Sequence, residues 1–198
     1  MDNNQVVLKT RTKNQVVLED LEQSKKIVHK AAPILHDIFD NNIHKYLFYT
    51  VEGRDDNISK ILDQNAGVDY ILKRDKDGQL FGIASRTQSI TRRRYDTFTI
   101  RKARASGAPT EFDKMRKAAR EEAFYPKWRM HIYYDKDTEN IVSLAIAKSM
   151  DILDFILAGY ADTNFTGRGQ VGQSEFYVVP WTQMNELGYE IYTYHEVK

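Results

Sequence analysis

One stretch, GVDYILKRDKDGQLFGIASRTQ at residues 67–88, constrains the fold more than any other part of the chain. Two runs rich in β-branched and aromatic residues flank an Asp-Gly pair, which is a strong hairpin signal because glycine accepts the positive φ of a tight turn. The stretch therefore predicts antiparallel strands over 68–74 and 80–88. Asp69 falls at the beginning of the first strand, and Arg86 lies toward the end of the second.

Helical and strand patterns follow one another on both sides of this hairpin. Apolar residues at helical spacing predict a helix over 18–38, kinked or divided at Pro33. Further strands are expected over 45–52, 96–102, 129–135, 140–148, 175–181 and 189–197, and shorter helices over 55–67, 108–124, 149–159 and 182–188. This order predicts an α/β fold: a single domain, 1–198, with a central mixed sheet that contains the hairpin and is flanked by helices.

The composition excludes several kinds of protein and site. The chain has no cysteine, which excludes disulfides, thiolate nucleophiles and cysteine-ligated metals. No run approaches the roughly 20 apolar residues of a membrane-spanning helix, and the polar start lacks a signal-peptide core, so we expect a cytoplasmic protein without a membrane partner. The letters GRGQVG at 167–172 precede a strand-like run rather than a helix, so they indicate a turn or mobile loop and not a dinucleotide site.

The net charge of +1 conceals a strong asymmetry along the chain. Residues 86–129 carry 13 Lys and Arg against 5 Asp and Glu, whereas residues 130–198 carry 4 against 10. A basic middle of this kind forms a phosphate-binding face if the fold gathers it on one side. The alternative is a solvated basic surface balanced by acidic neighbours.

The segment TRRRYDTFTIRKARASG, residues 91–107, is the strongest candidate for nucleic-acid binding. Its arginines are interleaved with Tyr95 and Phe98, a mixture that suits backbone phosphates and stacked bases. The alternative is a solubilising loop with its aromatics anchored in the core. In the helix that follows, Thr110 and Asp113 have the spacing of a capping box, and the apolar side is expected from Phe112, Met115 and Ala119. The arginines predicted to contact the nucleic-acid backbone are Arg92, Arg93, Arg94, Arg101 and Arg104.

Strand alternation places Ala84 and Arg86 on one face of the hairpin, where this pair would meet Asp69 across the ladder. Here the sequence resembles the restriction-endonuclease-like, or PD-(D/E)xK, superfamily. In that family a helix precedes a strand bearing an Asp, and after a hairpin the next strand carries an acid, any residue and a lysine. GVDYIL resembles the Asp-bearing strand, and GIASR lies where the acid-x-lysine strand would be. The resemblance covers about residues 18–150, with 151–198 as a C-terminal elaboration.

The resemblance implies a metal-dependent nuclease site with Asp69 as ligand of Mg²⁺ or Mn²⁺, Ala84 at the second acid and Arg86 at the lysine. Alanine cannot ligate a metal, and an arginine cannot act as a general base, although it binds phosphate bidentately. Acids that would replace the missing one are Glu19, Glu22 and Asp56, and Gln88 would contribute a carbonyl. Alternatively, Asp69 caps a turn or pairs with Arg86 across the hairpin.

The sequence therefore predicts a nucleic-acid-handling protein of nuclease-like fold, with DNA as the expected partner and catalytic roles for Asp69 and Arg86. Whether it is an active phosphodiesterase or a binding protein with a degenerate site stays open at this point. The competing hypothesis is a protein-interaction or inhibitor module from a mobile-element or phage-defence setting, by analogy only. A homodimer is compatible with either function.

Overall fold

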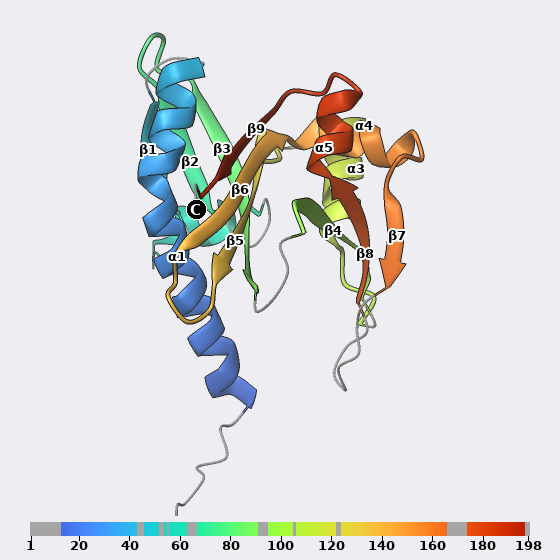
Figure 1. Ribbon diagram of the computed structural model, residues 1–198, viewed down its shortest axis with the longest axis horizontal. Coiled ribbons are helices and arrows are strands. Elements are labelled where there is room, and N and C mark those ends of the chain that lie inside the picture. The colour runs from blue at the N-terminus through green and yellow to red at the C-terminus, as the bar shows by residue number, and fades with distance from the viewer. Residues whose placement is uncertain are drawn as a thin grey trace, which may run out of the picture.

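The computed structural model describes residues 13–42, 46–51, 54, 56–62, 67–90, 95–104, 106–121, 124–165 and 174–196. Six strands form the central sheet in the order β1-β2-β3-β5-β6-β9 (Figure 1). These strands are β1 (Tyr46–Thr50), β2 (Tyr70–Arg74), β3 (Leu80–Ile90), β5 (Trp128–Asp135), β6 (Ile141–Lys148) and β9 (Ile191–His195). All neighbours are antiparallel except β3 and β5, which run parallel.

Three shorter strands form a second sheet in the order β4-β8-β7. They are β4 (Thr97–Arg104), β8 (Ser174–Pro180) and β7 (Asp162–Phe165), and both pairings are antiparallel. The helices are α1 (Lys13–Asn42), α2 (Asn57–Ile61), α3 (Glu111–Glu121), α4 (Ser149–Leu157) and α5 (Trp181–Glu186). This arrangement is the mixed α/β architecture with a central mixed sheet that the sequence predicts.

Helix α1 covers one face of the central sheet (Figure 1). Its apolar side, which includes Ile27, Ala31, Leu35 and Phe39, is buried against inward residues of β2, β3, β5 and β6 such as Met130. Each large aliphatic side chain buried in this way contributes about 1.5–3 kcal/mol to folding. The apolar side of the helix, which repeats every 3.6 residues, therefore packs on the side chains that alternate strand residues direct to this face of the sheet, and this packing holds the two layers together.

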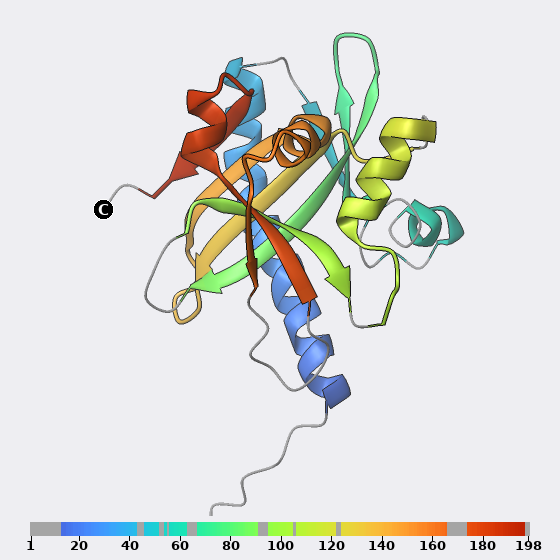
Figure 2. The same cartoon turned by 90° about the vertical axis from the view of Figure 1, so that its right-hand side faces the viewer.

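The opposite face of the central sheet is covered by the second sheet and by α3, α4 and α5 (Figure 2). The core on this side joins residues of these helices to both sheets, among them Phe98, Met115, Tyr133, Phe155 and Trp181. Both faces of β5 and β6 are therefore covered. A charged residue on the side of β5 that faces away from α1 must consequently find its partners inside the protein.

The β2–β3 hairpin is confirmed. Tyr70 pairs with Ile83 and Lys73 with Leu80, and the turn residue Gly78 has a φ of +70°, which favours glycine. After β3 the chain crosses to its parallel neighbour β5 through β4 and α3. That crossover brings the beginning of α3 to the same region as Asp69.

Some local features differ from the sequence predictions. Helix α1 continues through Pro33 and is not divided there, because its buried residues on both sides of the proline pack on the same sheet. In α3 the buried alanine is Ala118, and Ala119 is exposed. Strand β7 was not predicted, and the run 167–172 lies outside the described residues. Among the described residues, no helix combines the length and apolarity needed to span a membrane.

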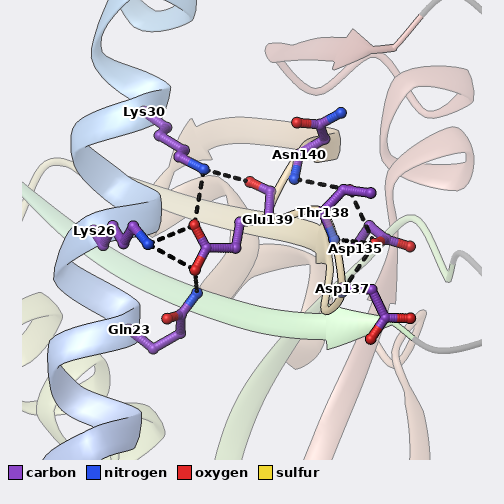
Figure 3. A network of polar contacts seen from close by, with 8 residues as sticks. All are labelled: Gln23, Lys26, Lys30, Asp135, Asp137, Thr138, Glu139 and Asn140. Atoms are coloured by element: carbon purple, nitrogen blue, oxygen red, sulfur yellow. Dashed lines mark hydrogen bonds and ion pairs between the residues drawn. The ribbon is translucent and has the colours of Figure 1, made fainter.

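A polar cluster fixes α1 to the turn between β5 and β6 (Figure 3). The Glu139 carboxylate accepts hydrogen bonds from Lys26 at 2.8 Å, Lys30 at 3.0 Å and Gln23 at 3.2 Å. Glu139 itself has a φ of +58°. We call these four residues the Glu139 clamp, and its donors lower the pKa of Glu139 to about 2.

Candidate functional site

A polar pocket of about 170 Å³ opens where β2, β3, β4, β5 and the beginning of α3 come together. Its lining brings together residues that are far apart in the sequence. They include Asp69, Ala84, Ser85, Arg104, Thr110, Glu111, Lys114, Tyr125 and Arg129. The lining therefore combines two carboxylates with three cations, and it contains two of the positions that the family resemblance singles out.

Asp69 lies directly before β2 and is half-buried in the wall of the pocket. Its backbone N–H donates to the carbonyl oxygen of Ile83 at 2.9 Å, and its carboxylate accepts from the backbone N–H of Ser85. Both bonds come from β3, so the hairpin fixes the position of this carboxylate. The structure thus places Asp69 across the ladder from the residues predicted to accompany it.

Ala84 and Arg86 share the face of β3 that points away from α1, as strand alternation predicts. Ala84 lines the pocket, whereas the guanidinium of Arg86 lies over the ring of Phe176, 4.7 Å from its centroid. Arg86 Nη1 is 4.0 Å from Glu111 Oε1. Burial lowers the pKa of Arg86, and the Glu111 carboxylate partly opposes that shift.

Glu111 is a site residue that the sequence analysis missed. Its carboxylate accepts from the backbone N–H of Arg101 at 2.6 Å and lies 3.6 Å from Arg129 Nη2. Burial by itself would raise the pKa of Glu111, but the charges of Arg129 and Arg86 together with the charge and the N–H of Arg101 outweigh it and lower the pKa below its ordinary value. We call Arg86, Arg101, Glu111 and Arg129 the Glu111 network.

Arg129 was also missed, and it is the most buried charged residue of the pocket, with 3% of its surface exposed. It projects from β5 on the side away from α1, and its Nη1 donates to the hydroxyl of Tyr125 at 3.4 Å. Burial lowers the pKa of Arg129, but Glu111, Tyr125 and Asp69 together raise it above the ordinary value. The guanidinium is therefore a fixed positive charge in the wall of the pocket.

Helix α3 begins at the pocket because its first turn is capped as the sequence predicts. Asp113 N–H donates to Thr110 Oγ1 at 3.3 Å, and Thr110 N–H donates to the Asp113 carboxylate at 2.9 Å, which is a reciprocal capping box. The cap sets Glu111 and Lys114 on the pocket side of the helix. A β-carbon added to Gly67 would lie 4.0 Å from Lys114 Nζ, which places this ammonium group beside the loop that precedes Asp69.

Of the five arginines predicted to contact nucleic acid, the structure describes Arg101 and Arg104. Arg104 is exposed at the end of β4 and lines the pocket. Arg101 lies on the same strand, and its guanidinium is 5.5 Å from the ring centroid of Phe176. Arg92, Arg93 and Arg94 lie outside the described residues. Their roles stay predictions.

His131 occupies the next position of β5 on the same side as Arg129. The Thr99 N–H donates to its Nδ1 at 3.4 Å, and its ring stacks on Tyr133 with centroids 4.7 Å apart. Burial, together with the charges of Arg86 and Arg129, holds the pKa of His131 well below 6.5. The residue is therefore neutral at neutral pH.

The described residues do not fit the metal site that the family resemblance implies. Ala84 offers no ligand, and the Glu111 carboxylate is engaged by two arginines and a backbone N–H. The described residues hold no group of three or more acidic or histidine side chains placed to bind a metal. Of the proposed replacement acids, Glu19 and Glu22 are on α1, and Asp56 caps α2 by accepting from Ser59 N–H at 2.9 Å.

Comparisons with known proteins give a match among solved structures. No protein-family model matches the chain, and no curated protein matches it significantly. Among solved structures, the chain is similar to D212, a nuclease from a fusselovirus, with 14% identity and a TM-score of 0.41. The alignment covers 82% of this chain and 84% of that chain.

Proposed function

We propose that the chain is a nucleic-acid-binding protein in which a backbone phosphate enters the pocket between β3 and α3. The observation that carries the proposal is the convergence of Arg104, Lys114 and Arg129 on a polar pocket of about 170 Å³. Cations that converge on a small polar concavity suit a phosphate group, and arginine binds phosphate through two parallel N–H donors.

The surroundings of the pocket extend the proposed contact along a nucleic-acid strand. Arg86 and Arg101 both lie over the ring of Phe176, and α3 carries further exposed cations. These exposed cations of α3 are Arg116, Lys117 and Arg120. These positive charges would contact the phosphates of the backbone rather than the bases. We therefore expect binding with weak sequence preference and an affinity that depends strongly on salt. DNA is the proposed partner.

The order of elements supports a nuclease-like ancestry for this binding site. Helix α1 precedes the strand that follows Asp69, and the hairpin leads to the strand carrying Ala84 and Arg86. Cleavage with Mg²⁺ or Mn²⁺ stays a prediction, with Asp69 as the proposed ligand and Arg86 as the phosphate-binding cation. A binding role agrees better with the side chains present, because Ala84 offers no metal ligand and the Glu111 carboxylate faces two arginines.

The test measures binding and cleavage of labelled single- and double-stranded DNA and RNA, in EDTA and in Mg²⁺. The variant is the double change Arg104→Gln and Lys114→Gln, and the matched control is Lys76→Gln with Lys136→Gln, which removes two positive charges from exposed turns. We expect the pocket variant to bind DNA at least about tenfold more weakly than the wild type and the control, since two phosphate contacts are lost.

Equal affinity of both variants would contradict the proposal. Cleavage that requires a metal and disappears in Asp69→Asn would instead establish the nuclease. Absence of both binding and cleavage would favour the protein-interaction module, whose basic middle would meet an acidic partner.

A further inference from the structure

The ion pairs of Glu111 are long for an interior site. Its Oε1 lies 3.6 Å from Arg129 Nη2 and 4.0 Å from Arg86 Nη1. Charge-assisted hydrogen bonds between nitrogen and oxygen normally measure about 2.7–2.9 Å. The two guanidinium groups therefore face a carboxylate without closing on it, and their capacity to bind an anion is only partly used.

The position of Glu111 is fixed from another direction. Its Oε2 accepts from the backbone N–H of Arg101 at 2.6 Å, which is the shortest of its contacts. This bond holds one carboxylate oxygen at β4, whereas the other oxygen is directed to the arginines. One oxygen of Glu111 thus faces both arginines as an anion that the protein itself supplies.

Arg129 cannot leave this place. It is buried, its Nη1 donates to Tyr125, and the negative charge of Asp69 acts on it from the hairpin side. Arg129 lines the pocket together with the carboxylates of Asp69 and Glu111. A cation beside two carboxylates takes the place that a divalent cation has in a two-carboxylate metal site. Unlike a metal ion, this charge is part of the chain.

We propose that Arg129 replaces a metal ion, so that the pocket binds a phosphoryl group without any metal, and that Glu111 is the internal anion that the phosphoryl group displaces. This inference rests on the proposed function for its nucleic-acid ligand. Arg129 binds the incoming oxygens and Lys114 adds a further positive charge from α3, both from the lining of the pocket. Arg86 does not line the pocket and contributes its charge through its contact with Glu111. Glu111 keeps its bond to the Arg101 N–H and turns its other oxygen away.

The variant Glu111→Gln separates this arrangement from a metal site. Glutamine has the same shape, and its amide oxygen can still accept from the Arg101 N–H, but it no longer competes with a phosphate for the arginines. We expect Glu111→Gln to bind inorganic phosphate about tenfold more tightly than the wild type, because phosphate then forms its charge-assisted contacts without displacing a carboxylate from the arginines. A metal site would show the reverse, since glutamine is a weaker ligand.

Calorimetry with inorganic phosphate in EDTA, at constant ionic strength, measures this difference, and added Mg²⁺ is expected to leave the affinities unchanged. Arg129→Lys keeps the charge but removes the forked donors, and we expect it to lose phosphate binding. Glu111→Gln leaves Arg129 with less negative charge around it, so the melting temperature of this variant is measured as well. Phosphate is expected to raise the melting temperature of the variant more than that of the wild type.

Two results would overturn the inference: affinity that depends on Mg²⁺, or a Glu111→Gln variant that binds phosphate no better than the wild type. A labelled oligonucleotide, measured in parallel, separates this inference from the proposed function. Phosphate binding that follows the expected order without oligonucleotide binding would leave the inference standing and remove the nucleic-acid function. Oligonucleotide binding that is unchanged in Glu111→Gln would leave the nucleic-acid function standing and remove the inference.

Discussion

The carboxylates of Glu139 and Glu111 each contact more than one cation, and they differ in depth and in geometry. In the Glu139 clamp, the lysine side chains are 56% and 41% exposed and lie 2.6 and 3.0 Å from Glu139 (Figure 3). In the Glu111 network, Arg129 and Arg86 are largely buried and lie 3.6 and 4.0 Å from Glu111. The exposed contacts are short, and the interior contacts are long.

This difference indicates different roles. Flexible lysines in solvent can close fully on a carboxylate, but water competes with the contact, so the clamp contributes little to stability beyond its part in holding α1 to the β5–β6 turn. The arginines are fixed by packing and cannot close on Glu111, although leaving them without an anion would be costly. A buried site with unused binding capacity is suited to a ligand, whereas the clamp is suited to structure.

The comparison predicts its largest effect for Glu111→Ala. This change leaves the buried Arg129 without its carboxylate partner and the Arg101 N–H without its acceptor. We expect a loss of about 3 kcal/mol in the free energy of unfolding, as is typical when one partner of a buried pair is removed. Urea denaturation of Glu111→Ala and Glu139→Ala checks this, and the Glu139 variant is expected to lose clearly less. Equal losses would break the comparison.

A smaller effect is expected from His131, whose pKa is lowered first by burial and then by the charges of Arg86 and Arg129. Its folded-state pKa is held well below 6.5, so below pH 6.5 the unfolded chain binds a proton that the folded chain does not. Stability should therefore fall as pH decreases from 6.5, by at most about 1.4 kcal/mol per pH unit.

Urea denaturation between pH 6.5 and pH 5 measures this slope. His131→Gln keeps an acceptor for the Thr99 N–H and should show a shallower slope than the wild type, because it removes the titrating group. The same slope in both proteins would mean that His131 is accessible to protons in the folded state.

The smallest effect belongs to the Glu139 clamp. Hydrogen bonds from Lys26, Lys30 and Gln23 lower the pKa of Glu139 to about 2, so its contribution to stability is present above the ordinary value of 4.5 and is lost as pH falls toward about 2. Titration by nuclear magnetic resonance should give this low pKa in dilute buffer. In about 1 M salt, or in Lys26→Met, the pKa should return toward 4.5, because exposed pairs are screened. An unchanged pKa would indicate a buried contact instead.

Much of the architecture was predictable because it depends on local patterns. The Asp-Gly turn fixed the hairpin, the period of 3.6 identified α1, and alternation put Ala84 and Arg86 on one face. The capping box at Thr110 and Asp113 was also correct in detail. These features require only neighbouring residues and the geometry of helices and strands.

The pocket was predictable only in part, because it is assembled by the crossover between the parallel strands β3 and β5. The position of Asp69 at the hairpin was predictable from the sequence. Glu111 reaches the pocket through the packing of α3, which no local pattern reveals. One signal was available: WRMHIYYD carries an arginine and a histidine on alternate positions of a strand that is otherwise apolar and aromatic. A charge inside such a strand indicates a buried polar site.

The most direct test of the central claim is the salt dependence of DNA binding in EDTA, measured for the wild type, the Arg104→Gln and Lys114→Gln double variant, and the Lys76→Gln and Lys136→Gln control. If a backbone phosphate enters the pocket, the slope of log K against log salt should be smaller by about two in the pocket variant and unchanged in the control. The same slope in all three proteins would show that these cations do not contact phosphate, and it would contradict the proposed role of the pocket.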